Sequence, residues 1–200
     1  EIILNRVFYG CESLTQIVIP SLVVSIGENA FYDCKSLAQI DIPSSVTTIG
    51  KGAFYGCKSL TQIAIPSSVV MIDDSLFYGC SALTQVTIPP AVTIIGNSAF
   101  NGCSALTQVE IPPAVTRIGN SAFNGCSSLA QMTIPPLVKY IDNNAFDFCF
   151  SLRHLIIQSP NVKYGYNCFS RCSSLTSLTI PTNSSIREDA FPKNINIHYS

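Results

Sequence analysis

Apolar residues return along this chain with a period of 23 residues, and every period repeats the same order of apolar and polar positions. The unit is clearest from Pro43 to Ile65, PSSVTTIGKGAFYGCKSLTQIAI. Phenylalanine marks the period at Phe8, Phe31, Phe54, Phe77, Phe100, Phe123, Phe146 and Phe169. Cysteine marks it at Cys11, Cys34, Cys57, Cys80, Cys103, Cys126, Cys149 and Cys172. Such self-similarity predicts a solenoid, in which each repeat contacts only its neighbours.

We therefore expect a single solenoid domain over residues 1–200, made of about eight repeats. Ile3 precedes Phe8 by five residues, as Ile26 precedes Phe31, so the first repeat begins midway. The segment 182–200 departs from the period and predicts an irregular capping repeat. The first coil shows no comparable cap, which predicts that it can pair with another molecule and allow self-association.

One side of each coil is predicted to be a short strand. In the segment from Leu60 to Pro66, Ile63 and Ile65 alternate with polar or small residues, which is the period of a strand. Proline has no N–H for a ladder and therefore fits the end of the strand. Like positions of successive coils would pair about 4.8 Å apart. The repeat thus predicts a parallel β-sheet along one side of the solenoid.

The other side is predicted to contain short strands and helical or 3₁₀ turns. The apolar pair Val46 and Ile49 indicates a second short strand. The spacing of Ala53, Phe54 and Cys57 is helical and predicts a single helical or 3₁₀ turn. Between them lies a position that alternates between glycine and aspartate, which predicts left-handed backbone. It is occupied by Gly27, Gly50, Asp73, Gly96, Gly119, Asp142 and Gly165.

Composition excludes several classes of function. Apolar residues make up 47% of the chain and charged residues 12%, which fits a narrow coil whose side chains point inward. No run of about 18 apolar residues is present, so no membrane span is expected in this fragment. The net charge is −1 without a basic cluster, which argues against nucleic acid as a partner. The chain opens at Glu1 without a signal peptide, so its own residues carry no targeting evidence.

The pattern I-x-I-P-x-x-V-x-x-I-G-x-x-A-F-x-x-C-x-S-L, present from Ile40 to Leu60, resembles the BspA-like leucine-rich repeat family. The resemblance covers nearly the whole chain and implies a leucine-rich-repeat solenoid. Members of the family are typical of surface proteins of oral and gut bacteria and of surface antigens of parasitic protists. It also implies a cell-surface or extracellular location and adhesion to proteins, matrix or glycans of host or other microbial cells.

The cysteines allow two interpretations. A secreted protein with nine cysteines invites a disulfide framework. Eight of them share one repeat position, however, which favours a ladder of buried thiols acting as small apolar residues. Cys168 lies outside this ladder, four residues before Cys172, and the pair could form a bridge or Cys168 could be a packing substitution. No CxxC pair or nearby histidine offers a zinc site, so no metal or cofactor is expected.

The solvent face of the predicted sheet is the first candidate binding surface. In the resembling family this face is the usual ligand surface. The alternative is a ladder of glutamines that bond to one another and merely keep the sheet soluble. The first row of candidates is Gln16, Gln39, Gln62, Gln85, Gln108, Gln131 and His154. The second row contributes Asp41, Thr87 and Glu110.

A row of tyrosines along one edge is the second candidate surface. Aromatic residues are enriched at protein interfaces, so the row could contact a protein or glycan. The rings could equally shield the edge of the coil. The row is Tyr9, Tyr32, Tyr55 and Tyr78.

Catalysis finds little support in the sequence. Asp41 and Glu110 lie three coils apart, about 14 Å by strand spacing, whereas glycosidase carboxylates lie about 5–9.5 Å apart. His154 and Ser177 would be neighbours, but Gln131 stands where an orienting acid is needed. We therefore expect no catalytic residue and a non-enzymatic surface adhesion module. The alternative hypothesis is an intracellular or self-associating interaction scaffold.

Overall fold

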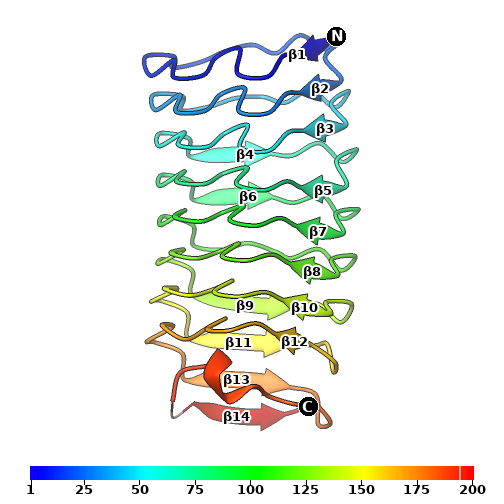
Figure 1. Ribbon diagram of the computed structural model, residues 1–200, viewed down its shortest axis with the longest axis vertical. Helices are drawn as coiled ribbons and strands as arrows, with labels where there is room; N and C mark the ends of the chain where they lie inside the picture. Colours follow the sequence, from blue (N-terminus) through cyan, green and yellow to red (C-terminus); the bar gives the residue numbers. More distant parts are fainter. Residues whose placement is uncertain (194) are drawn as a thin grey trace.

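The computed structural model describes residues 1–193 and 195–200 of the chain. Its coils stack along one axis, with the two termini at opposite ends (Figure 1). All strand pairs are parallel, and paired residues up to β13 are 23 positions apart, as in Gln62 with Gln85. The predicted parallel solenoid is therefore confirmed. We number the coils one to eight by the phenylalanine that each contains, from Phe8 to Phe169.

Two columns of short strands run along the solenoid (Figure 1). The front ladder follows the Leu-Thr-Gln-Ile segment of each coil and comprises β4 (Gln62–Ala64), β6 (Gln85–Thr87), β9 (Gln131–Ile134), β11 (His154–Ile157), β13 (Ser177–Ile180) and β14 (Asn196–Tyr199). The rear ladder comprises β1 (Ile2–Ile3), β2 (Ser25–Ile26), β3 (Thr48–Ile49), β5 (Met71–Ile72), β7 (Ile94–Ile95), β8 (Arg117–Ile118), β10 (Tyr140–Ile141) and β12 (Lys163–Tyr164).

The front ladder is not continuous. β4 pairs with β6, and β9, β11, β13 and β14 form a separate four-stranded sheet. Coil five, which should supply a strand between β6 and β9, has none in its 106–111 segment. In the first two coils the pairing is reduced to one isolated bridge between Val18 and Asp41. The continuous sheet expected from the period is thus broken at two places.

The predicted helical or 3₁₀ turn at Ala53 to Cys57 is wrong. In this segment the N–H groups of Gly52, Phe54 and Gly56 donate to carbonyls of the next coil at 2.7–3.0 Å, while the intervening N–H groups bond within their own coil. Gly52 and Gly56 have positive φ, which interrupts any helical run. The segment is a chain of tight turns, and the one 3₁₀ helix of the described residues is η1 (Glu188–Ala190).

Glycine occupies the Gly50 position of the repeat for a different physical reason from the predicted one. Its φ is not positive, so left-handed backbone is not required there. A Cβ built on Gly50 would come within 2.7 Å of the Glu28 nitrogen, and one on Gly96 within 2.7 Å of the Asp74 nitrogen. Close contact with the preceding coil, rather than backbone conformation, therefore favours glycine at this position.

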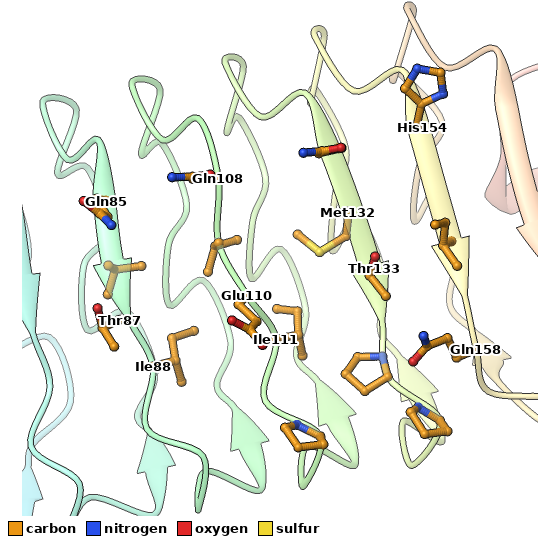
Figure 2. A pocket seen from close by; sticks show the side chains of 17 residues that line it. Gln85, Thr87, Ile88, Gln108, Glu110, Ile111, Met132, Thr133, His154 and Gln158 are labelled. Atoms are coloured by element: carbon orange, nitrogen blue, oxygen red, sulfur yellow. The ribbon is translucent and has the colours of Figure 1, made fainter.

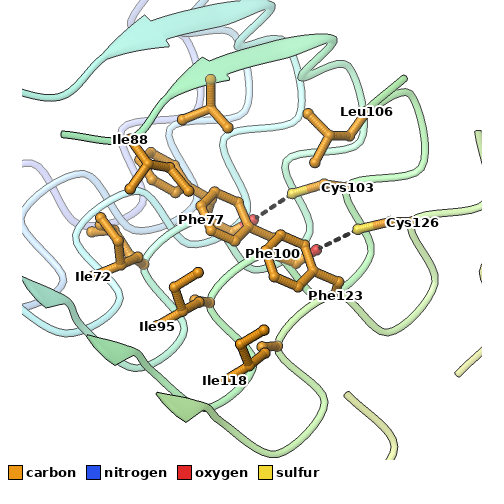
Figure 3. Close-up of a cluster of buried hydrophobic side chains, with 14 of the residues drawn as sticks. Ile72, Phe77, Ile88, Ile95, Phe100, Cys103, Leu106, Ile118, Phe123 and Cys126 are labelled. Atoms are coloured by element: carbon orange, nitrogen blue, oxygen red, sulfur yellow. Dashed lines mark hydrogen bonds between the residues drawn. The ribbon is translucent and has the colours of Figure 1, made fainter. Parts of the chain in front are cut away.

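The core is a set of columns of identical side chains. The Phe rings stack from coil to coil at centroid distances of 5.0–5.7 Å, and all except Phe8 and the terminal Phe191 are fully buried. Figure 3 shows Phe77, Phe100 and Phe123 between a column of isoleucines and a column of cysteines. Each buried large apolar side chain contributes about 1.5–3 kcal/mol, so stability accumulates with the number of coils.

All nine cysteines are free thiols, and eight are buried. Each ladder thiol from coil two onward donates to the carbonyl of the phenylalanine 26 residues earlier, as Cys103 does to Phe77 at 3.2 Å. Cys168 Sγ lies 3.1 Å from the Gly165 carbonyl, and Cys172 Sγ donates to Phe146 at 3.2 Å. The ladder is therefore a hydrogen-bonded column of thiols, and Cys168 is a packing substitution without a bridge to Cys172.

The two ends of the solenoid differ. β14 pairs with β13 and completes the front ladder at the C-terminal end, although Asn194 of the predicted 182–200 cap lies outside the described residues. In coil one, Phe8, Leu14 and Ile17 are only partly buried, whereas their counterparts in coil three are fully or almost fully buried. Among the helices of the described residues, none has the length and apolar character to cross a membrane. Self-association through coil one stays a prediction.

Candidate functional site

A groove of about 810 Å³ opens on the solvent face of the front ladder, across coils four to seven (Figure 2). Gln85, Gln108 and Gln131 line it as one row, and His154 continues that row. Thr87, Glu110 and Thr133 line it as a second row. We call this hollow groove A. Six of the ten residues that the sequence predicts for the sheet face therefore lie in one groove.

A smaller groove of about 360 Å³, groove B, lies over coils two to four. Gln39, Asp41 and Gln62 line it, and it shares Gln85 and Thr87 with groove A. Gln16 lines neither groove. Both grooves follow from the alternation of the strands, since Gln62 and Ala64 of β4 are exposed while Ile63 is buried. Which of these residues bind a ligand stays a prediction.

The polar groups of the grooves are free to accept a ligand. No hydrogen bond joins one glutamine side chain of this row to another, and the carboxylates of Asp41 and Glu110 have no ion-pair or hydrogen-bond partner in the part of the chain that the structure describes. All these side chains are exposed. The self-bonded glutamine ladder, which was the alternative to a binding surface, is therefore not formed in this structure.

The titratable side chains of groove A are not in contact with one another. His154 lies in groove A with Glu110, but two coils separate them, about 10 Å by strand spacing. Proton transfer between two groups requires a hydrogen-bond distance of about 2.6–3.2 Å. Gln131 and Ser177 flank His154 in the ladder, and neither can supply an orienting carboxylate. Within the described residues, no group of histidine, cysteine, aspartate or glutamate side chains could hold a metal ion.

The tyrosine row is a stack of nearly parallel rings. Tyr9, Tyr32, Tyr55 and Tyr78 follow one another at centroid distances of 4.4–4.5 Å. Burial raises the pKa of Tyr55 to about 12, with a smaller contribution from the neighbouring tyrosines. Tyr9 at the open end is exposed and the other three are half-buried. None of them lines a groove, so the row is a surface distinct from grooves A and B.

The rear ladder presents an exposed row that the sequence analysis missed. Met71, Ile94, Arg117, Tyr140 and Lys163 are register partners in successive coils, and all are exposed. The Arg117 guanidinium and the Lys163 ammonium each lie 5.7 Å from the Tyr140 ring. The signal was present in the sequence, because the residue at this position varies widely, while the next residue is isoleucine in every coil but the last, which has Tyr164.

The family comparison agrees with the period. A family model described as a BspA type leucine rich repeat region matches residues 1–113 and 93–199. Among curated proteins, none matches the chain.

Solved structures share the solenoid. A leucine-rich repeat protein of T. pallidum is 32% identical, with a TM-score of 0.78 over 87% of this chain and 82% of that chain. A leucine rich cell surface protein of Faecalibacterium prausnitzii is 28% identical, with a TM-score of 0.56 over 96% and 74%. A leucine-rich repeat protein of Bacteroides ovatus is 25% identical, with a TM-score of 0.60 over 82% and 63%, so this chain spans less than two thirds of it.

Proposed function

Because the chain belongs to the BspA-type leucine-rich repeat family, we propose that it is a non-enzymatic binding module of the cell surface. Its ligand is a protein or glycan of a host or another microbial cell, held against the front ladder. The observation that carries the proposal is that two grooves with unpaired polar side chains open on this one face. The similar protein of Faecalibacterium prausnitzii, which is described as a cell surface protein, supports the location.

Location and binding can be tested separately. Antibody labelling of the native protein on intact cells should give the same signal as labelling after permeabilisation. Signal confined to permeabilised cells would overturn the surface location and favour the intracellular scaffold. The purified chain should then bind to host cells or to immobilised matrix proteins in a saturable manner.

Two triple variants identify the face that binds. Replacing Gln85, Gln108 and Gln131 by alanine removes the amides of groove A without touching the core, and should abolish cell binding. Replacing Tyr32, Tyr55 and Tyr78 by serine is the matched variant for the tyrosine row. Loss of binding only in the tyrosine variant would transfer the site to that row. Undiminished binding in both variants would refute both surfaces.

Self-association through coil one is a second role that one observation favours. Ile2, Leu4 and Val18 of the first coil are each more than half exposed and offer an apolar surface. Sedimentation velocity of the full chain should then show a concentration-dependent dimer. A strict monomer at high concentration would remove this role and leave the binding proposal unaffected.

A further inference from the structure

Groove A lies where the front ladder loses its hydrogen bonds. No backbone hydrogen bond connects Gln108, Val109, Glu110 or Ile111 to the coil on either side. Val109 is partly exposed, whereas its counterparts Val86 and Met132 are buried. Unpaired backbone N–H and C=O groups form obligatory hydrogen bonds with whatever partner is available. The front segment of coil five therefore has backbone N–H and C=O groups without a backbone partner in the neighbouring coils.

Each groove contains an acid in the second row of the front ladder. Coil five has Glu110 in the second row and coil two has Asp41, while coils three, four and six have Ala64, Thr87 and Thr133 there. Groove B lies at the second break, since β4 pairs with β6 and not with the segment of Asp41. Glu110 therefore places a charge where coil five forms no strand, and Asp41 places one in groove B, where β4 pairs only with β6.

The charge in groove A favours one kind of ligand group. Among the described residues that line groove A, Glu110 has the only carboxylate, and the side-chain amides of Gln108 and Gln131 add acceptor oxygens. In the part of the chain that the structure describes, no lysine or arginine lines either groove. A guanidinium carries five N–H donors in a plane, so it can bind a carboxylate in a bidentate manner and still donate to neighbouring carbonyls.

We propose that the break at coil five is an anchoring site for an arginine side chain of an extended peptide segment, with Glu110 as its counter-charge. This rests on the proposed function and names the ligand class of its groove. A second arginine binds at Asp41 in groove B. The two acids lie three coils apart, about 14 Å, which an extended peptide spans with about four residues. The ligand is therefore a protein segment with two arginines about four residues apart.

The test uses the full chain and defined peptides. Fluorescence anisotropy measures binding of fluorescein-labelled GRSTSRG, of its lysine counterpart GKSTSKG and of the version with citrulline, which keeps the shape of arginine but is neutral. The arginine peptide should bind tightest, the lysine peptide more weakly, and the citrulline peptide should lose roughly tenfold or more.

Three variants locate the site. E110Q keeps size and hydrogen bonding but removes the charge, and should weaken the arginine peptide roughly tenfold. D41N should weaken it by a smaller factor, and should not affect a peptide with one arginine. E28Q changes the net charge by the same amount on an exposed residue outside both grooves and should leave binding unchanged. Equal losses in E110Q and E28Q would reveal a non-specific charge effect and refute the site.

The outcomes separate this inference from the proposed function. Absence of binding of the arginine peptide to the wild-type chain, or undiminished binding in E110Q, refutes the arginine site. If cell binding is then still lost in the triple glutamine variant, the groove is a binding surface for another ligand. Cell binding that survives protease treatment of the host cells but not glycosidase treatment would identify a glycan and overturn the peptide ligand.

Discussion

Raising the pH above 9 is expected to destabilise the solenoid, because its buried thiols keep protons that the same thiols release in the unfolded chain. Burial raises the pKa of five ladder thiols well above the ordinary value of 9.0, namely Cys57, Cys80, Cys103, Cys126 and Cys149. Each also donates its proton to a phenylalanine carbonyl, a bond that the thiolate cannot form.

The sign and size follow from linkage between protonation and folding. A group whose pKa is higher in the folded chain stabilises it fully below the unfolded pKa, and this contribution is lost as the pH rises past that value. Above pH 9, each buried thiol lowers the free energy of unfolding by about 1.4 kcal/mol per pH unit. Five thiols together cost about 2 kcal/mol at pH 9 and about 7 kcal/mol at pH 10. Because domains are stable by only about 5–15 kcal/mol, this loss approaches the whole stability.

Urea unfolding followed by circular dichroism at pH 7, 8, 9, 9.5 and 10, with a reducing agent present, measures the free energy of unfolding. The control replaces Cys80, Cys103 and Cys126 by serine, which keeps a hydrogen-bond donor but does not titrate. Its loss of stability at pH 10 should be about 4 kcal/mol smaller than that of the wild type, because three titrating thiols are removed. A wild-type stability that is unchanged to pH 10, or a serine variant that loses as much as the wild type, would refute the reasoning.

Three further predictions test the core and the break. Maleimide labelling of the native chain should modify Cys11, the one exposed thiol, and all nine thiols after unfolding; several reactive native thiols would contradict the column. F100A should lower the free energy of unfolding by about 3–5 kcal/mol and F8A by clearly less, since Phe8 is partly exposed; equal losses would contradict this. E110T should close the ladder, raising the melting temperature and the hydrogen-exchange protection of the Val109 amide; unchanged protection would count against the break.

The columns of the core could be predicted from the sequence because they repeat at one spacing. Phe54, Cys57 and Leu60 recur in every full repeat. When the coils stack in register, the side chains at each of these positions lie on one another and are buried together. The alternation of Gln62, Ile63 and Ala64 likewise predicted which side chains face the solvent. These features depend on the period and on the local pattern, and both are visible in one sequence.

The turn at Ala53 to Cys57 could not be assigned from its spacing. A helix and a chain of tight turns both bring residues three apart to the same side, so the pattern fits either. The choice is made by hydrogen bonds to the next coil, in which alternate N–H groups from Gly52 to Gly56 take part. Those bonds join residues 22 positions apart and leave no trace in the local pattern.

The breaks of the front ladder show why the site had to be found in the structure. Within coil five the core is unchanged, since Phe100 and Cys103 are fully buried and the Phe100 N–H donates to Ala122 of the next coil at 2.7 Å. The Phe and Cys columns thus hold the coil in the stack while its front segment loses its pairing. The front segment is only one side of the coil, so an acidic residue such as Glu110 is tolerated there at small cost in stability. Ligand groups can collect at such departures from the repeat, because the repeated positions are already occupied in holding the coils together.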